Sequence, residues 1–239
     1  VACPTILPSS VFGADAPSER IMVGHIGVGG QGGGLLRAFV GQPGGMSIAT
    51  CDPFKDRREG KAKWIDAGYS KKMGKTYKGC KTYNDFRELL ARDDIDAVVV
   101  GTPDHWHAKM TMDCIAAGLD VVVEKGMTRT TDEAKTVYNA VRNSGCIFTA
   151  GSRSLRHGAY WNARDVVKTG VLGKLLWAQT STARNYPVQD VIIPSAQPTG
   201  EEGSAGPLGT GDNNILWDEY HGPGPIRNWE PDRFFNWRW

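Results

Sequence analysis

The chain has 239 residues, of which 40% are hydrophobic and 23% charged, and its formal net charge is +2. A chain of this length buries one core, or one core and a smaller second unit. The near-neutral charge gives no reason to expect a nucleic acid or an anionic membrane surface as partner, and no apolar run approaches the ~18 residues of a membrane span.

Residues 1–19 differ in composition from the rest of the chain. They are apolar, rich in small residues and almost uncharged. Ala14-Asp15-Ala16 has the small-x-small form of an export cleavage site. We therefore expect the remnant of an export signal and a periplasmic or secreted protein. The alternative is a disordered N-terminal arm on a cytoplasmic protein.

Residues 20–151 alternate short apolar runs with amphipathic stretches, the pattern of a doubly wound parallel sheet. A run such as Asp96-Ala-Val-Val-Val-Gly101 is apolar enough to be a central strand buried on both faces. Asn84 is the expected cap of one helix, and Thr130 with Glu133 forms a capping box for another. The predicted strands cover 21–27, 47–51, 96–101, 120–124 and 146–150, and residues 71–81 are expected to form a solvated loop or a sheet edge. One predicted helix follows the glycines and ends at Gly41, and the other longer helices cover 54–67, 108–117 and 130–145.

The pattern changes after Gly151. A helix at 159–169 and a strand at 175–182 are followed by an irregular region that contains four of the eight tryptophans. Such aromatic density is expected to pack against another surface. Because the sequence stops at Trp239 without a polar tail, we expect 152–239 to be an incomplete α+β domain.

A glycine-rich turn follows the first predicted strand. Gly27 allows the tight turn, Gly29 lets the backbone approach a pyrophosphate, and Gly32 lets the next helix pack close to the strand. Gly30 and Gln31 complete the run, and free N–H groups at the helix N-terminus suit a phosphate. We therefore expect this turn to bind a dinucleotide.

Asp52 stands 20 positions after Gly32, at the end of the second predicted strand. An acidic residue there hydrogen-bonds the ribose hydroxyls of NAD and repels the 2′-phosphate of NADP, so NAD is the predicted cofactor. Arg57 and Arg58 could reach a 2′-phosphate, which keeps NADP as the less favoured alternative. Asp52 could also cap the helix that Pro53 would begin.

The segment after the fourth strand contains Thr102, Pro103, His105 and His107. Ligands bind outside the carboxyl ends of strands in such sheets, so the backbone here and His105 are expected near the nicotinamide half of the cofactor. The two histidines have His-x-His spacing but no evident third ligand, and we predict no metal site.

Glu124 and Lys125 follow the fifth strand on the same edge. A lysine there could exchange a proton with a substrate hydroxyl while a hydride moves to the nicotinamide. From composition alone, a strand-end lysine is more commonly a solvated charge.

Together these motifs resemble the Gfo/Idh/MocA family of NAD(P)-dependent sugar and inositol oxidoreductases. The resemblance rests on residues 27–32, 52, 102–107, 124–125 and 151–153. It implies a Rossmann domain followed by a domain with an open, mostly antiparallel sheet. It also implies that Lys125 is the catalytic lysine, that His105 and Glu124 lie near the cofactor, and that Ser152 and Arg153 line the crossover to the substrate domain.

The resemblance implies an NAD-dependent oxidoreductase that acts on a sugar or polyol hydroxyl, and possible self-association through the second domain. One alternative is an NAD-dependent glycosidase of the same superfamily, which cleaves by transient oxidation. The other is a non-catalytic cofactor-binding remnant.

Two departures from the family pattern bear on these alternatives. Gly126 replaces the proline of the family's Glu-Lys-Pro, which loosens the turn beside Lys125. The family's catalytic Asp/His pair would fall beyond Trp239.

Overall fold

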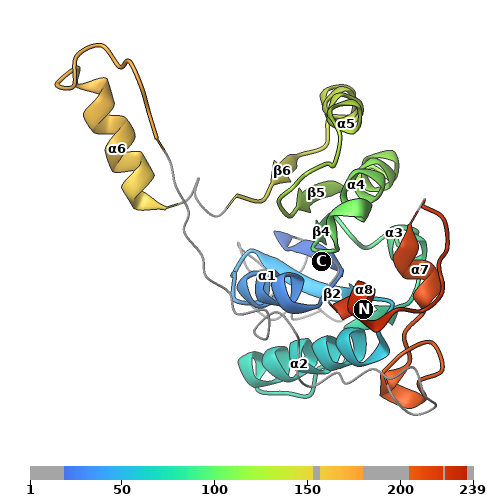
Figure 1. The fold of residues 1–239 in the computed structure, drawn as a ribbon. Coiled ribbons are helices and arrows are strands. Elements are labelled where there is room, and N and C mark those ends of the chain that lie inside the picture. Colours follow the sequence, from blue (N-terminus) through green and yellow to red (C-terminus); the bar gives the residue numbers. More distant parts are fainter. Residues whose placement is uncertain (1–18, 153–156, 180–204, 223, 236–239) are drawn as a thin grey trace, which may run out of the picture.

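The structure is a computed structural model that describes residues 19–152, 157–179, 205–222 and 224–235. At its centre is a six-stranded sheet with the order β3-β2-β1-β4-β5-β6 (Figure 1). All five pairings between neighbouring strands are parallel. The strand order reverses between β1 and β4, so the fold is the expected doubly wound Rossmann sheet.

Two βαβ halves build this sheet. Crossovers between parallel strands are right-handed, and the two halves proceed in opposite directions from β1 and β4, so their helices cover opposite faces. The first half comprises β1 (Ile21–Ile26), α1 (Gly30–Val40), β2 (Gly45–Cys51), α2 (Lys55–Met73) and β3 (Lys81–Tyr83). Helix α3 (Phe86–Leu90) crosses from β3 to β4 and packs on the face of the second half, where Phe86 contacts Trp106. The second comprises β4 (Ala97–Val100), the 3-10 turn η3 (Asp104–Trp106), α4 (His107–Ala116), β5 (Asp120–Val123), α5 (Thr131–Ser144) and β6 (Phe148–Ala150).

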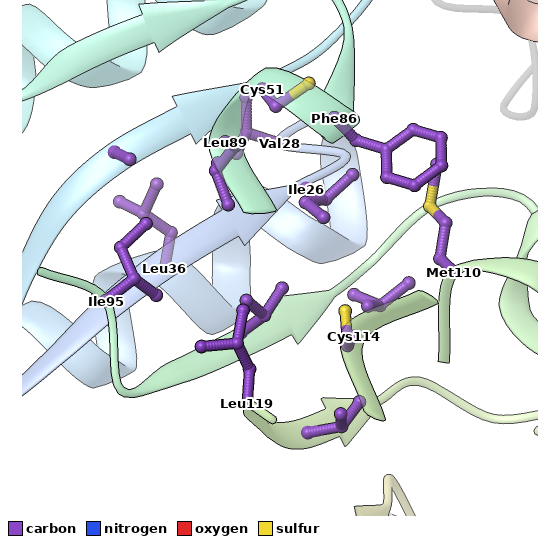
Figure 2. Packing of buried hydrophobic residues seen from close by; sticks show 14 of the residues in the cluster. Ile26, Val28, Leu36, Cys51, Phe86, Leu89, Ile95, Met110, Cys114 and Leu119 are labelled. Carbon is purple, nitrogen blue, oxygen red and sulfur yellow. The ribbon is translucent and has the colours of Figure 1, made fainter. Parts of the chain in front are cut away.

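The main core lies around the central strands. Val98 and Val100 of β4 are fully buried, as expected for a strand covered on both faces. Leu36 of α1, Leu89 of α3 and Cys114 of α4 are also fully buried in this cluster (Figure 2). Burial of each aliphatic side chain contributes about 1.5–3 kcal/mol, so this core holds the two halves in register.

Some element boundaries differ from the predictions. Helix α2 continues to Met73 and ends where Gly74 adopts a left-handed φ of 65°. The cap of α3 is Asp85, whose side chain accepts a hydrogen bond from the Arg87 N–H, and the prediction of Asn84 was wrong. The capping box of Thr130 and Glu133 is confirmed.

The chain after β6 only partly follows the prediction. Helix α6 (Gly158–Lys168) has no buried residue and stands apart from the sheet (Figure 1). Residues 175–179 form no strand, and the rest of the predicted strand lies outside the described residues. The described parts of 152–239 contain no named strand, so they show no second sheet.

The aromatic segment, residues 205–235 without Pro223, returns to the Rossmann domain. Within it lie the 3-10 turn η6 (Gly211–Asn213), α7 (Trp217–His221) and α8 (Pro231–Phe235). Its contacts with the start of α2 include an isolated bridge between Phe54 and Ile215 and a hydrogen bond of 3.0 Å from the Leu216 N–H to the Pro53 carbonyl. The described part of the tryptophan-rich region therefore packs against the start of α2.

Two further predictions concern the chain outside the main body. Of the expected export-signal remnant, residues 1–18 lie outside the described residues. Among the described helices, none is both long and apolar enough to cross a membrane.

Candidate functional site

The glycine turn has the backbone geometry that the sequence predicted. Gly27 has a φ of 76°, and its N–H donates to the Cys51 carbonyl at 2.8 Å. A Cβ on Gly32 would lie 1.8 Å from the Gly27 carbonyl oxygen, so the helix start touches the turn directly. These two positions need glycine for conformation and for space, respectively.

The N-terminus of α1 suits a phosphate group. Its cap is Gly29, which offers no side chain to the first N–H groups of the helix. A Cβ on Gly29 would meet the Arg57 guanidinium at 3.3 Å, whereas one on Gly30 would meet nothing within 4 Å. Open backbone donors, a positive dipole end and a neighbouring guanidinium together match the charge of a pyrophosphate.

Asp52 lies beside this turn at the end of β2. Its Oδ2 accepts from the Val28 N–H at 3.0 Å and its Oδ1 from the Phe54 N–H at 2.9 Å. The residue is 4% exposed, and burial raises the pKa of its carboxyl, while Arg57 and the two N–H donors act in the opposite direction. Phe54 is the N-cap of α2, so Asp52 orients the turn and the helix start without being the cap itself.

A cavity of about 270 Å³ extends along the carboxyl ends of the strands. It is lined by the glycine turn, Asp52, Thr102, Pro103, Glu124 and Lys125, among others. The Thr102 hydroxyl is buried and has no hydrogen-bond partner among the described residues, and an orphaned polar atom in a cavity wall is suited to a ligand. The residues present therefore fit a dinucleotide, which the glycine turn and Asp52 would hold by its pyrophosphate and ribose.

Glu124 joins the glycine turn to the lysine. Its Oε1 accepts from Gln31 Nε2 at 2.9 Å, and its Oε2 accepts from the Lys125 N–H at 3.1 Å. Glu124 is 8% exposed, whereas Lys125 is exposed at the cavity. The peptide that joins Lys125 to Gly126 is cis. The cluster thus presents a lysine ammonium group at the end of the cavity opposite Asp52.

The two histidines after β4 point in different directions. His105 Nε2 donates to the Tyr220 carbonyl at 2.7 Å, and burial lowers the pKa of this imidazole. His105 does not line the cavity that holds Asp52 and Lys125. His107 is fully buried and contacts the Thr102 and Gly126 carbonyls. Within the described ranges, no three His, Cys, Asp or Glu side chains gather into a metal-binding group.

The predicted substrate residues are only partly visible. Ser152 is exposed just after β6, and Arg153 lies outside the described residues. Gly151 lies against Glu124, because its Cβ would meet the Glu124 Cα at 3.2 Å. The chain therefore leaves the Rossmann sheet beside Glu124, which neighbours Lys125 in the cavity wall.

The aromatic segment supplies a cavity wall that the sequence did not predict. Glu219 and Tyr220 of α7 and Phe234 and Phe235 of α8 line the cavity near Asp52. Phe234 also lies under the Arg57 guanidinium, 5.0 Å from its carbon to the ring centroid. The aromatic density indicated that this segment packs against something, but no local signal indicated the partner.

These features define the class of the protein: a Rossmann fold whose glycine turn suits a dinucleotide and whose cavity is also lined by a lysine. The comparison with known families agrees. Residues 21–152 match GFO_IDH_MocA, the oxidoreductase family with an NAD-binding Rossmann fold. Since the match covers more than half of the chain, the chain belongs to the Gfo/Idh/MocA family.

Relatives by sequence carry a glycosidase name. The chain is 30% identical over 223 residues to a glycosyl hydrolase family 109 protein from Solibacter usitatus, which covers 89% of this chain and 47% of the relative. A protein of the same name from Saccharopolyspora erythraea is 29% identical over 218 residues. This alignment covers 87% of this chain and 44% of the relative. The chain spans about half the length of these curated relatives.

A dehydrogenase and a ketoreductase are among the solved structures with a similar fold. The myo-inositol 2-dehydrogenase of Lactobacillus plantarum aligns with a TM-score of 0.55 at 23% identity, over 66% of this chain and 43% of the other. KijD10, a 3-ketoreductase from Actinomadura kijaniata in complex with NADP, aligns with a TM-score of 0.51 at 27% identity. The alignment covers 65% of this chain and 46% of the other chain. The first similarity supports the fold alone.

Proposed function

We propose that this chain is an NAD-dependent oxidoreductase of the Gfo/Idh/MocA type that acts on a hydroxyl group of a sugar or polyol. The observation that carries the proposal is that Lys125 shares one cavity with the glycine turn and Asp52. A dinucleotide anchored at the turn would extend along the strand ends toward this lysine.

In the proposed reaction the cofactor would take the hydride and the protein would take the proton. Bound NAD supplies an acceptor for the hydride that leaves the substrate carbon. Lys125 Nζ would take the proton of the same hydroxyl and return it in the reverse direction. Glu124 supports this role because its carboxylate accepts the Lys125 N–H at 3.1 Å and so fixes the backbone from which the lysine extends.

Asp52 supports NAD over NADP. Its carboxylate lines the cavity and is held by two backbone N–H groups, so it would meet the ribose hydroxyls directly. A 2′-phosphate at this position would lie against a carboxylate in a poorly solvated site. Arg57 also lines the cavity and is the residue that would favour NADP.

A second candidate is an NAD-dependent glycosidase. The glycosyl hydrolase name of the sequence relatives, which align over 89% and 87% of this chain, favours it. In such a reaction the hydride is returned to the sugar after the glycosidic bond breaks, and no net NADH forms. Lys125 would serve the same proton transfer at the hydroxyl that is transiently oxidised.

One assay distinguishes these candidates. The chain would be incubated with a panel of sugars and polyols and with aryl glycosides, with and without NAD. Net NADH supports the dehydrogenase, NAD-dependent aglycone release without net NADH supports the glycosidase, and cofactor binding without either reaction refutes both. Lys125→Met should lower the rate about 10²–10⁴-fold, whereas Lys135→Met, at an exposed lysine on α5, should leave it unchanged.

A further inference from the structure

Lys125 stands on a turn with little restraint of its own. Gly126 follows it, and a Cβ there would meet only the Thr128 carbonyl oxygen, at 3.7 Å. Glycine has the widest choice of backbone conformations, and no packed side chain holds this one. Contacts from outside the turn therefore add to the Glu124 hydrogen bond in setting the direction of the lysine.

His107 makes such a contact. It is the first residue of α4 and is fully buried. Its Nδ1 lies 2.7 Å from the Gly126 carbonyl oxygen, and its Nε2 lies 2.8 Å from the Thr102 carbonyl oxygen. One ring thus touches the two loops that carry the polar wall of the cavity.

In both contacts the histidine ring must be the hydrogen-bond donor. A carbonyl oxygen only accepts, so each contact requires a hydrogen on the ring nitrogen that faces it. A hydrogen on Nδ1 ties the ring to the Gly126 loop, and a hydrogen on Nε2 ties it to the Thr102 loop. Losing either bond removes the protein partner of that carbonyl, which frees its loop to move.

We propose that His107 is a positioning residue for Lys125: its ring fixes the Gly126 carbonyl against the Thr102 carbonyl and so aims the lysine along the cavity. Glu124 holds the N–H of Lys125 from the other side. The inference rests on the proposed role of Lys125, but the arrangement itself is testable without any substrate.

Two variants separate the two contacts. An asparagine amide nitrogen can occupy the position of Nδ1 and a glutamine amide nitrogen that of Nε2. His107→Asn should therefore keep the bond to Gly126, and His107→Gln should keep the bond to Thr102 and release Gly126. His107→Phe removes both bonds while keeping an aromatic ring.

The direct readout is the ¹H–¹³C NMR signal of reductively methylated Lys125, assigned by its absence in Lys125→Arg. We expect this signal to remain in place in His107→Asn and to shift in His107→Gln and His107→Phe. Cys114→Ser, at a fully buried residue of the same helix, is the control: it should lower stability without shifting the Lys125 signal. If His107→Gln leaves the signal unmoved, or if Cys114→Ser shifts it equally, the positioning role is refuted.

Turnover gives an independent second readout. If the proposed function holds, His107→Gln should lower kcat by about 10²-fold with little change in the KM for NAD, since a displacement near 1 Å suffices for such a loss. A loss confined to KM would contradict the proposal. If no variant, including wild type, turns over any substrate, the proposed function fails while the NMR comparison still decides the role of His107.

Discussion

Replacing Gly32 by alanine should disrupt the phosphate turn from within. A Cβ at this position would lie 1.8 Å from the Gly27 carbonyl oxygen and 3.2 Å from that of Gly101, both of them backbone atoms. Ordinary contacts begin near ~3.5 Å, so the start of α1 must retreat by about 1.7 Å from the Gly27 carbonyl oxygen. Overpacking of this kind costs about 1–3 kcal/mol, and we expect the upper end because no flexible side chain can yield.

Gly34→Ala is the matched control on the same helix. A Cβ there meets nothing within 4 Å, and alanine is favoured over glycine in a helix by about 0.5–1 kcal/mol. The two substitutions should therefore change the free energy of unfolding in opposite directions, as measured by urea unfolding with tryptophan fluorescence. Gly32→Ala should also weaken NAD binding at least ~10-fold by calorimetry, since a 1 Å displacement has large effects at such sites. Equal stabilities for the two variants would refute the close approach of turn and helix.

Three further outcomes are expected. Asp52→Ala should weaken NAD more than NADP in calorimetric titrations, and an equal loss would restrict Asp52 to orienting the turn. Phe234→Ala, at a residue 3% exposed, should destabilise the docked aromatic segment by about 3–5 kcal/mol in hydrogen exchange, whereas Ile226→Ala, 66% exposed, should not; equal effects would contradict the docking. Burial lowers the pKa of the His25 imidazole to about 3. Between pH 6.5 and 3 this imidazole is therefore protonated in the unfolded chain but neutral in the folded chain. Relative to His25→Gln, wild-type stability should therefore fall by about 1.4 kcal/mol per pH unit on acidification through that range, and parallel profiles would refute the buried neutral imidazole.

The parts that could be predicted from the sequence are those set by local chemistry. The run of valines before Gly101 indicated a strand buried on both faces, and β4 is central in the sheet. The spacing of Gly27, Gly32 and Asp52 predicted a strand, a turn and a helix in register, which the structure shows. Such features depend on residues only a few positions apart or on one known fold, so they can be recognised in a single sequence.

Contacts between distant segments could not be predicted in this way. Ile215 pairs with Phe54 across more than 150 positions, and no periodicity links them. His105 stands where a residue at the end of β4 would face the cofactor, yet the Tyr220 carbonyl holds it on another surface. The end of α2 at Met73 was missed because its charged, weakly amphipathic sequence carries no clear apolar stripe, and Gly74 is the actual stop.

The site itself was foreseen as a set of residues but not as an arrangement. Glu124 and Gln31 are far apart in sequence, and their hydrogen bond of 2.9 Å links the phosphate turn to the lysine. The sequence showed His107 only as one half of a His-x-His pair without a third ligand, and its two carbonyl contacts became visible only in three dimensions. Side-chain hydrogen bonds of this kind depend on the packing of several loops at once.

The central claim is that this chain binds a dinucleotide in the cavity between the glycine turn and Lys125. Thermal unfolding of the purified chain with NAD, with NADP and without ligand tests it most directly. Binding predicts stabilisation by about 2.7 kcal/mol at 100 times the dissociation constant, with NAD effective at a lower concentration than NADP. An unfolding temperature that neither dinucleotide changes, at any concentration up to the millimolar range, would contradict the claim.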